Sequence, residues 1–190
     1  MTQLGNGLHD VKCFQDALSV QEAELSTKRR LGAPDESILT VQGNLANTYE
    51  KLKRNEEALR MLQDVYSGRL ELNGKENEET LRAANNYAST LNVLKRFEEA
   101  KALLRKTIPV ARRVLGEGHG LTLKMRKNYA KALFRDPGAT LDDLREALTT
   151  LEDTKRTARR VLGGAHPLTV DIEESLRRAA LAAREGTKIK

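Results

Sequence analysis

The fold is decided by the stretch NLANTYEKLKRNEEA, residues 44–58, because the chain repeats it. The stretch returns as NYASTLNVLKRFEEA at residues 86–100, which is 42 residues further along. A third copy begins at Asn128-Tyr129-Ala130 and ends at Leu144-Arg145-Glu146-Ala147, with an insertion of five residues around Pro137-Gly138. A repeat of this length is typical of stacked helical hairpins, each of which buries its apolar face against the next.

Each repeat predicts two helices joined by a short turn. In the best-formed copy, Leu45, Ala46, Tyr49 and Leu52 follow helical spacing and predict a first helix over residues 37–53. Asn55 is expected to be the N-cap of a second helix over residues 56–72, which Asn73-Gly74 would end. By the same reasoning, further helices are expected at residues 81–95, 97–115, 121–134, 140–162 and 168–184. Thr140 to Asp143 reads as a capping box, and Pro167 suits a first helical turn.

The whole chain, residues 1–190, is therefore expected to be a single all-α solenoid of antiparallel helix hairpins. About four and a half repeats are expected, with bounds at residues 1–34 (partial), 35–76, 77–118, 119–165 and 166–185. Leu4 to Ala17 matches the end of a first helix and its turn, so the chain opens inside a hairpin. We favour a fragment of a longer solenoid over a shortened cap.

Composition agrees with a helical protein and points to a cytoplasmic, intracellular setting. Charged residues make up 32% of the chain and aromatic residues 4%, and no run of about 18 apolar residues occurs. Met1 to Asp10 lacks the basic and then apolar pattern of a signal peptide. Cys13 is the sole cysteine, so no internal disulfide can form.

The positive charge lies in the second half of the chain. Residues 1–95 hold 12 Lys and Arg against 14 Asp and Glu, whereas residues 96–190 hold 21 against 13. An acidic partner would be attracted to the second half first.

The repeat pattern resembles the tetratricopeptide repeat (TPR), on the residues Leu45-Ala46-x-x-Tyr49 followed by Ala58 and Leu62. The 42-residue period and the phrases Val114-Leu115-Gly116-Glu117-Gly118-His119 and Val161-Leu162-Gly163-Gly164-Ala165-His166-Pro167 resemble the longer repeats of kinesin light chains and nephrocystin-like proteins. The resemblance implies a right-handed α-solenoid that serves as a non-catalytic protein-binding adaptor or scaffold.

The same resemblance implies that the first helix of each hairpin lines a concave, partner-binding face. The residues expected to bind a partner there are Asn47, Lys51, Arg82, Asn85, Ser89, Lys124, Lys127, Lys131 and Arg135. Their neighbours on the same stripe are Thr40, Gly43, Glu50, Asn92, Asp171, Glu174 and Arg178. Lys124, Lys127 and Lys131 share one helix face, which favours an acidic or extended peptide segment. A solvated helix face is the alternative interpretation.

Asparagine recurs in the repeats at two kinds of position. Asn44, Asn86 and Asn128 occupy one equivalent position, where packing between helices is favoured over ligand contact. Asn47 and Asn85 lie on the adjacent stripe and are the better ligand candidates, because an amide can bond the backbone of an extended peptide.

We identify no catalytic residue, metal ligand or cofactor site. His9, His119 and His166 are isolated, and Cys13 has no nearby histidine. Gly116-x-Gly118-x-Gly120 follows a helix rather than a strand, so it is not a dinucleotide loop.

Two rival functions stay open. Arg112-Arg113, Arg159-Arg160 and Arg177-Arg178 favour nucleic-acid binding, although the first two pairs also suit helix C-termini and the aromatic residues mostly occupy packing positions. The incomplete N-terminal hairpin presents Leu4, Leu8, Val11 and Phe14, which would allow an architectural role through self-association. We favour the peptide-binding adaptor over both; no membrane partner is expected.

Overall fold

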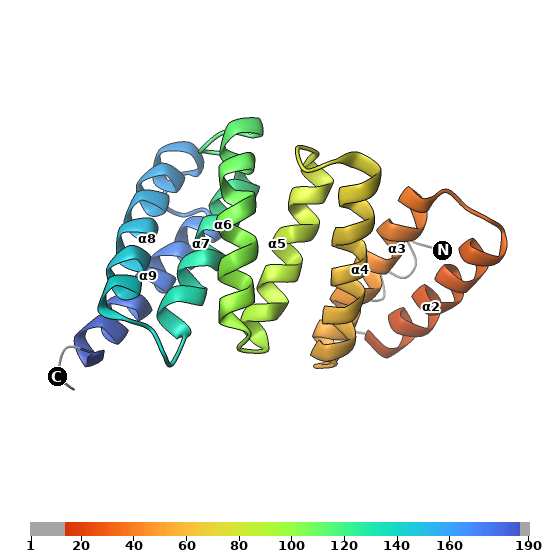
Figure 1. Cartoon of the computed structure of the whole chain (residues 1–190), viewed down its shortest axis with the longest axis horizontal. Helices are drawn as coiled ribbons and strands as arrows, with labels where there is room; N and C mark the ends of the chain where they lie inside the picture. Colours follow the sequence, from red (N-terminus) through yellow and green to blue (C-terminus); the bar gives the residue numbers. More distant parts are fainter. Residues whose placement is uncertain (1–13, 187–190) are drawn as a thin grey trace. The chain divides into compact units, whose positions relative to one another are not determined.

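The computed structural model of the chain describes residues 14–186 as a succession of antiparallel α-helices joined by short turns (Figure 1). The helices are α2 (Phe14–Arg30), α3 (Asp35–Lys51), α4 (Asn55–Asn73), α5 (Glu78–Val93), α6 (Phe97–Val114), α7 (Gly120–Arg135), α8 (Leu141–Leu162) and α9 (Pro167–Gly186). The helices α3, α5, α7 and α9 are the first helices of the predicted hairpins, and α4, α6 and α8 are the second helices.

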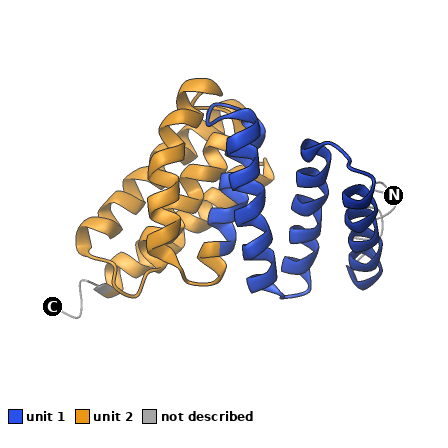
Figure 2. Ribbon diagram, turned by 45° about the vertical axis from the view of Figure 1, so that its right-hand side comes forward, with its two compact units in different colours: residues 1–90 blue, residues 91–190 orange. Residues whose placement is uncertain are grey.

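The chain divides into two compact units, residues 1–90 and residues 91–190, with the boundary inside α5 (Figure 2). In unit 1, α3 packs against both α2 and α4. In unit 2, α7 packs against α6, α8 and α9, and α8 also packs against α9.

The core of unit 1 is the apolar stripe that the repeat pattern predicts. Leu45 and Ala46 are almost fully buried, as are Ala58 and Leu62 of the next helix. They belong to a core that includes Leu18, Leu25, Val41, Leu45, Tyr49 and Ala58. Burying one such leucine side chain contributes about 1.5–3 kcal/mol, so the stripe accounts for the stacking of these helices.

Unit 2 repeats this arrangement with equivalent residues. Its largest fully buried side chains include Leu104, Leu123, Leu133, Leu151 and Ile172. The Tyr129 hydroxyl, at the position equivalent to Tyr87, donates to Glu146 at 2.6 Å and accepts from Arg105 at 2.8 Å. The aromatic residue of this repeat therefore links three helices.

Helix ends follow the predicted signals with two corrections. The first helices expected to run to residues 53 and 95 end at Lys51 and Val93 instead. Thr140 and Asp143 form the predicted capping box, α9 begins at Pro167, and Gly74, Gly116 and Gly163 have φ of +76°, +94° and +86°. The N-cap of α4 is Arg54 rather than Asn55, and its side chain makes no capping hydrogen bond. Asn55 was the wrong choice because α4 begins one residue earlier than predicted.

The turns inside the hairpins contain a feature that the sequence pattern does not reveal. Lys53 and Lys95 adopt φ of +63° and +62°, the left-handed conformation that glycine usually supplies. They occupy equivalent positions between α3 and α4 and between α5 and α6. The tight hairpin turn therefore carries backbone strain at two lysines.

Candidate partner-binding site

In unit 1, a hollow lies beside the first helices α3 and α5. We call it the α3–α5 hollow; it measures about 140 Å³, and its lining includes Thr40, Gly43, Asn44, Asn47, Arg69, Glu79, Arg82 and Asn86, with apolar side chains such as Leu62 and Val65. Three amide side chains and two arginines around a partly apolar hollow can bond the backbone of an extended peptide and accommodate a side chain.

The predicted site residues of unit 1 do not all reach this hollow. Asn47 and Arg82 line it, whereas Lys51, Asn85 and Ser89 are not among its lining residues. Asn85 is only 7% exposed, so it offers little surface to a ligand. Arg82 donates to Glu78 at 2.6 Å and to Glu79 at 3.1 Å, so carboxylates of its own helix already hold its guanidinium.

Asn44 and Asn86 line the α3–α5 hollow although their recurrence favoured a packing role. The sequence signal that could have identified them is a small residue close by on the same helix. Gly43 directly precedes Asn44, and Ala83 lies three residues before Asn86. A Cβ at Gly43 would meet no atom within 4 Å, so this glycine is not required for helix packing.

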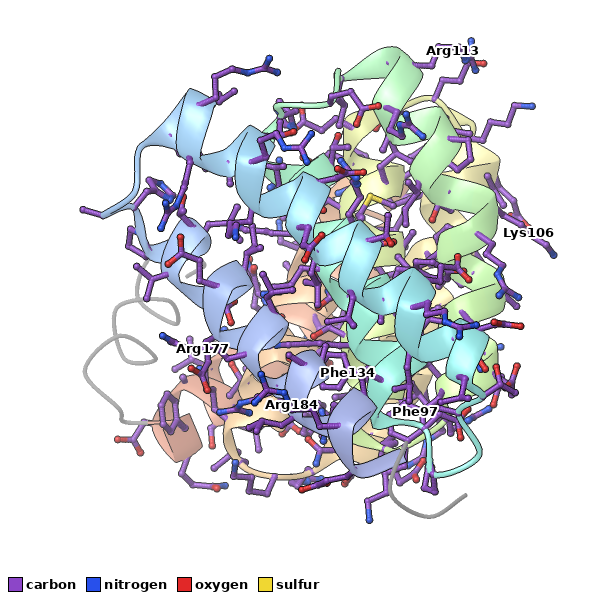
Figure 3. All side chains as sticks on the ribbon, turned by 90° about the vertical axis from the view of Figure 1, so that its left-hand side faces the viewer. Phe97, Lys106, Arg113, Phe134, Arg177 and Arg184 are labelled. Atoms are coloured by element: carbon purple, nitrogen blue, oxygen red, sulfur yellow. The ribbon has the colours of Figure 1, made fainter. Side chains whose placement is uncertain are left out.

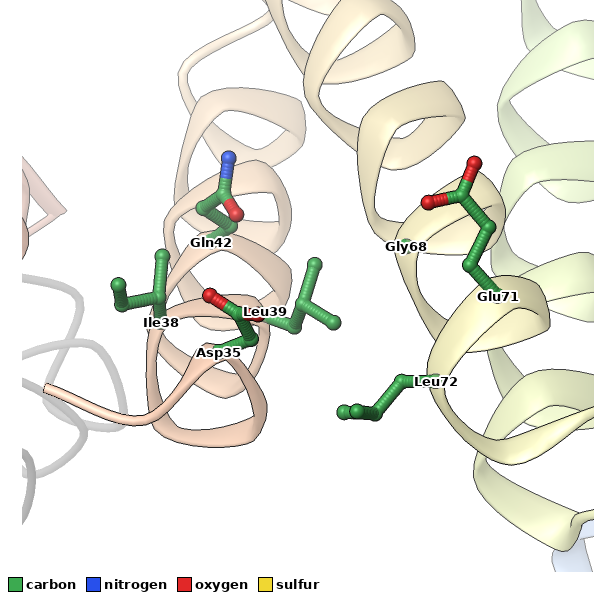
Figure 4. A pocket seen from close by; sticks show the side chains of 7 residues that line it. All are labelled: Asp35, Ile38, Leu39, Gln42, Gly68, Glu71 and Leu72. Carbon is green, nitrogen blue, oxygen red and sulfur yellow. The ribbon is translucent and has the colours of Figure 1, made fainter.

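A second hollow in unit 1 has a different character. It lies between the start of α3 and the end of α4, measures about 450 Å³, and is lined by Asp35, Ile38, Leu39, Gln42, Gly68, Glu71 and Leu72 (Figure 4). Leu39 and Leu72 extend into the space from opposite helices, and its two ionisable residues are acidic. This hollow does not suit the acidic partner that the charge of the chain predicts.

In unit 2, the predicted lysines of α7 meet the last helix. Lys127 is 11% exposed, and its ammonium forms an ion pair with Asp171 of α9, whereas Lys131 lies 3.9 Å from the same carboxylate. A hydrogen bond from Lys127 and the nearby charges of Lys127, Lys131 and Arg178 hold the pKa of Asp171 low against the opposing effect of burial.

The carboxylate of Asp171 carries one negative charge, and several cations lie around it. Burial lowers the pKa of the Lys131 ammonium, and the charge of Lys127 lowers it further; Asp171 acts in the opposite direction, and Arg135 and Arg178 add to the lowering. We call Lys127, Lys131, Arg135 and Arg178, together with Asp171, the α7–α9 cation cluster. The three cations near Lys131, which are Lys127, Arg135 and Arg178, outnumber the carboxylate of Asp171.

The remaining predicted cations lie at the margins of this cluster. The Lys124 side chain is exposed and makes no hydrogen bond or ion pair with residues 14–186. Arg135 is also exposed at the end of α7. Arg178 donates to Glu174 at 2.9 Å, and Arg177 donates to the same carboxylate at 2.7 Å. The cluster therefore keeps a net positive charge after both carboxylates are counted.

The pairing of Lys127 with Asp171 could have been expected from the repeat. Both residues were assigned to the same inward stripe, and they are 44 residues apart, close to one period. Opposite charges about one repeat apart on this stripe are thus the useful signal.

The two histidines within residues 14–186 have a structural role. His119 and His166 act as helix caps, with Nδ1 accepting from the backbone of Leu121 at 3.3 Å and Leu168 at 3.1 Å. Within residues 14–186, no group of three or more His, Cys, Asp or Glu side chains could hold a metal ion. No helix of this part is long and apolar enough to span a bilayer. Cys13 and the N-terminal residues Leu4, Leu8 and Val11 lie outside the described residues.

Comparison with known families identifies the repeats. Two family models described as tetratricopeptide repeat match residues 38–79 and 79–136, which together span just over half of the chain. These matches include α3, α4, α5, α6 and α7, and therefore both the α3–α5 hollow and the lysines of α7. No curated protein matches the chain significantly.

Solved structures show the same architecture. One match is a structure of nearly identical TPR-like repeats of a putative kinesin light chain from Podosopora anserina, in a form that carries one substitution. It has a TM-score of 0.81 and 20% identity, and the alignment covers 98% of this chain and 86% of that one. The form without this substitution matches with a TM-score of 0.79, again at 20% identity and with coverage of 98% and 86%. BtubC (BKLC) from P. vanneervenii matches with a TM-score of 0.73 and 14% identity, covering 98% of this chain and 76% of that one.

At these identities the structural matches show the fold, which is an all-α solenoid of the kind found in kinesin light chain repeats. Solenoids of this kind are protein-interaction scaffolds that present extended binding surfaces. On its repeats, its helix hairpins and the two family matches, the chain belongs to the tetratricopeptide repeat proteins.

Proposed function

We propose that the chain is a non-catalytic adaptor that binds an acidic, extended peptide segment. The observation that carries the proposal is the α7–α9 cation cluster, in which Lys127, Lys131 and Arg178 lie around Asp171 and Arg135 adds a further cation near Lys131. Like charges at this spacing repel one another, and a bound carboxylate would relieve the repulsion.

Each residue of the cluster would contribute differently. Lys127 is largely buried and ion-paired, so it mainly holds Asp171 in place. Lys131 and Arg135 are more accessible and would meet the carboxylates of the ligand directly. Lys124, one turn before Lys127, would extend the charged face.

In unit 1, the α3–α5 hollow supports the same kind of binding by different chemistry. Asn44, Asn47 and Asn86 can donate to and accept from an extended backbone, and Gly43 leaves room for its close approach. A disordered segment loses conformational entropy when it is bound, so an affinity of the order of micromolar is expected.

A peptide-array screen with acidic sequences, followed by fluorescence anisotropy with the best binder, tests the proposal. Lys131→Gln combined with Arg135→Gln should weaken binding roughly tenfold, because two accessible charge contacts are lost. Binding should also weaken with added salt. A screen without any acidic binder, or a double variant that binds as tightly as the parent, would contradict the proposal.

The matched control is Lys106→Gln combined with Arg145→Gln. It removes the same number of charges from α6 and α8, and Lys106 projects outward from α6 (Figure 3). The control should bind the acidic peptide as the parent does. Equal weakening in both variants would mean that net charge, rather than the cluster, governs binding.

A labelled single-stranded RNA tests the nucleic-acid alternative in the same assay. None of the aromatic side chains in residues 14–186 is exposed, and Phe97 and Tyr129 are buried, so they offer no stacking platform for bases. Tighter binding of RNA than of every acidic peptide would replace the adaptor proposal with a nucleic-acid function.

A further inference from the structure

Four arginines from three helices converge on a hollow of unit 2 that is separate from the α7–α9 cation cluster. The hollow measures about 410 Å³, and its charged lining consists of Arg112, Glu117, Arg126, Asp153, Arg156 and Arg160. Although Arg126 is next to Lys127 in the sequence, it faces Glu117 and Asp153, whereas Lys127 faces Asp171. We call this feature the arginine hollow.

Arg126 lies in the interior of this hollow and is only 15% exposed. Its guanidinium donates to Glu117 at 3.3 Å, which is its one hydrogen bond to a residue of the described chain, although an arginine carries five N–H donors. Burial lowers the pKa of Arg126; Glu117 and Asp153 act in the opposite direction, and Arg112 adds to the lowering. The hollow therefore keeps a buried cation that its neighbours compensate only in part.

The other three arginines add accessible charge around Arg126. Arg112 is ion-paired with Glu117, and Arg156 lies 3.5 Å from Asp153. The Arg160 side chain is exposed and makes no hydrogen bond or ion pair within residues 14–186. Four guanidinium groups against two carboxylates leave two positive charges in excess.

Helix electrostatics account for only part of this arrangement. Arg112 and Arg160 lie in the last turns of α6 and α8, where a cation stabilises the helix C-terminus. Arg126 lies in the middle of α7, and Arg156 lies before the last turn of α8. Their convergence with the other two has no such explanation.

We propose that the arginine hollow binds a phosphoryl group carried by a serine or threonine of a partner polypeptide. A phosphorylated side chain carries nearly two negative charges and three acceptor oxygens, which match the excess of two positive charges and the planar donor pairs of guanidinium groups. A single carboxylate would balance only one of these charges. The volume of the hollow suits one modified side chain with its neighbours rather than a bare anion.

A short peptide with one phosphoserine between glycine and alanine residues is the probe, with its serine and glutamate counterparts as comparisons. By fluorescence anisotropy, the parent chain should bind the phosphoserine peptide roughly tenfold tighter than either counterpart. Equal binding of the serine peptide would overturn the proposal, and so would equal binding of the glutamate peptide. Inorganic phosphate should displace the phosphoserine peptide only at far higher concentrations than the peptide itself needs for binding. If phosphate displaces it at equally low concentrations, the ligand is free phosphate and not a polypeptide, which overturns the proposal.

Arg156→Ala combined with Arg160→Ala should reduce binding of the phosphoserine peptide roughly tenfold, because two charge-assisted contacts are lost. Both residues are exposed, so the fold should be retained, which thermal melting by circular dichroism checks. The matched control, Arg145→Ala with Arg177→Ala, removes two exposed arginines from α8 and α9 and should leave binding unchanged. Equal losses in the two variants would overturn the proposal.

Arg126→Lys provides a second variant that keeps the charge but removes the planar donor pair. It should weaken binding of the phosphopeptide several-fold while leaving the serine peptide unaffected. Unchanged binding would contradict a phosphate contact at Arg126. The residues of this test do not belong to the α7–α9 cation cluster. A failure of the phosphoserine proposal can therefore be told apart from a failure of the acidic-peptide proposal.

Discussion

Lys127 and Lys131 differ in their surroundings although they lie on one face of the same helix. Lys127 is nearly buried and forms an ion pair with Asp171, whereas Lys131 is 29% exposed and lies among three other cations. Reversing the charge of Lys127 would place a carboxylate against Asp171 in a largely buried position. The two residues therefore have a structural role and a binding role, respectively.

This difference predicts that the two lysines contribute unequally to stability. Lys127→Gln should lower the free energy of unfolding by about 1–2 kcal/mol, because Asp171 loses the partner that holds its pKa low. Lys131→Gln should leave stability unchanged or slightly raised, because it removes a charge that its neighbours repel. Urea denaturation of both variants measures this. A larger loss at Lys131 than at Lys127 would contradict the assignment.

Two glycines inside the helices of unit 1 also have different roles. At Gly68 of α4, an added Cβ would lie 2.8 Å from Leu39 Cδ2, so this glycine allows close packing. At Gly43 of α3, an added Cβ would enter open space beside the α3–α5 hollow. Glycine there destabilises the helix without a packing reason, which favours a role in binding.

Gly43→Ala should therefore stabilise the protein by about 0.5–1 kcal/mol, because alanine loses less conformational freedom on folding. Gly68→Ala should gain less, because Leu39 must move to make room for the new methyl group. Thermal melting of the two variants gives the comparison. A greater gain at Gly68 would show that the space at Gly43 is not available.

At the scale of the helices, the strained turns between hairpin partners offer a test of the local backbone. Lys95→Gly should stabilise the protein by about 0.5–1 kcal/mol, because glycine adopts positive φ without the steric cost that lysine has there. Lys53→Gly should behave in the same way at the equivalent position. Melting temperatures that fall in both variants would indicate that these lysines stabilise the turn by another interaction.

Helix positions could be predicted because each repeat contains its own local signals. The apolar spacing around Leu45 and Tyr49, the glycines after the second helices and the capping box at Thr140 act within one or two turns. The left-handed turns at Lys53 and Lys95 could not be predicted, because lysine has no preference for that conformation.

At the scale of the whole molecule, the sequence identified the fold class, the repeat family and the charged helix of the candidate site. It could not show which cations were already paired, because Asp171 is 44 residues from Lys127 and approaches it only after α9 packs against α7. The arginine hollow was hidden for the same reason. In the sequence, Arg112 and Arg160 can be explained as residues at helix ends. Only the packing of α6, α7 and α8 shows that Arg126 and Arg156 line the same hollow.

The most direct test of acidic-peptide binding by the α7–α9 cation cluster is a chemical-shift titration of the isotopically labelled chain. The titrant is the tightest acidic peptide from the array, added at low and at high ionic strength. Shifts should concentrate at Lys131, Arg135 and Arg178 and diminish as salt is added. If the peptide binds while these three residues do not shift, the cluster is not its binding site.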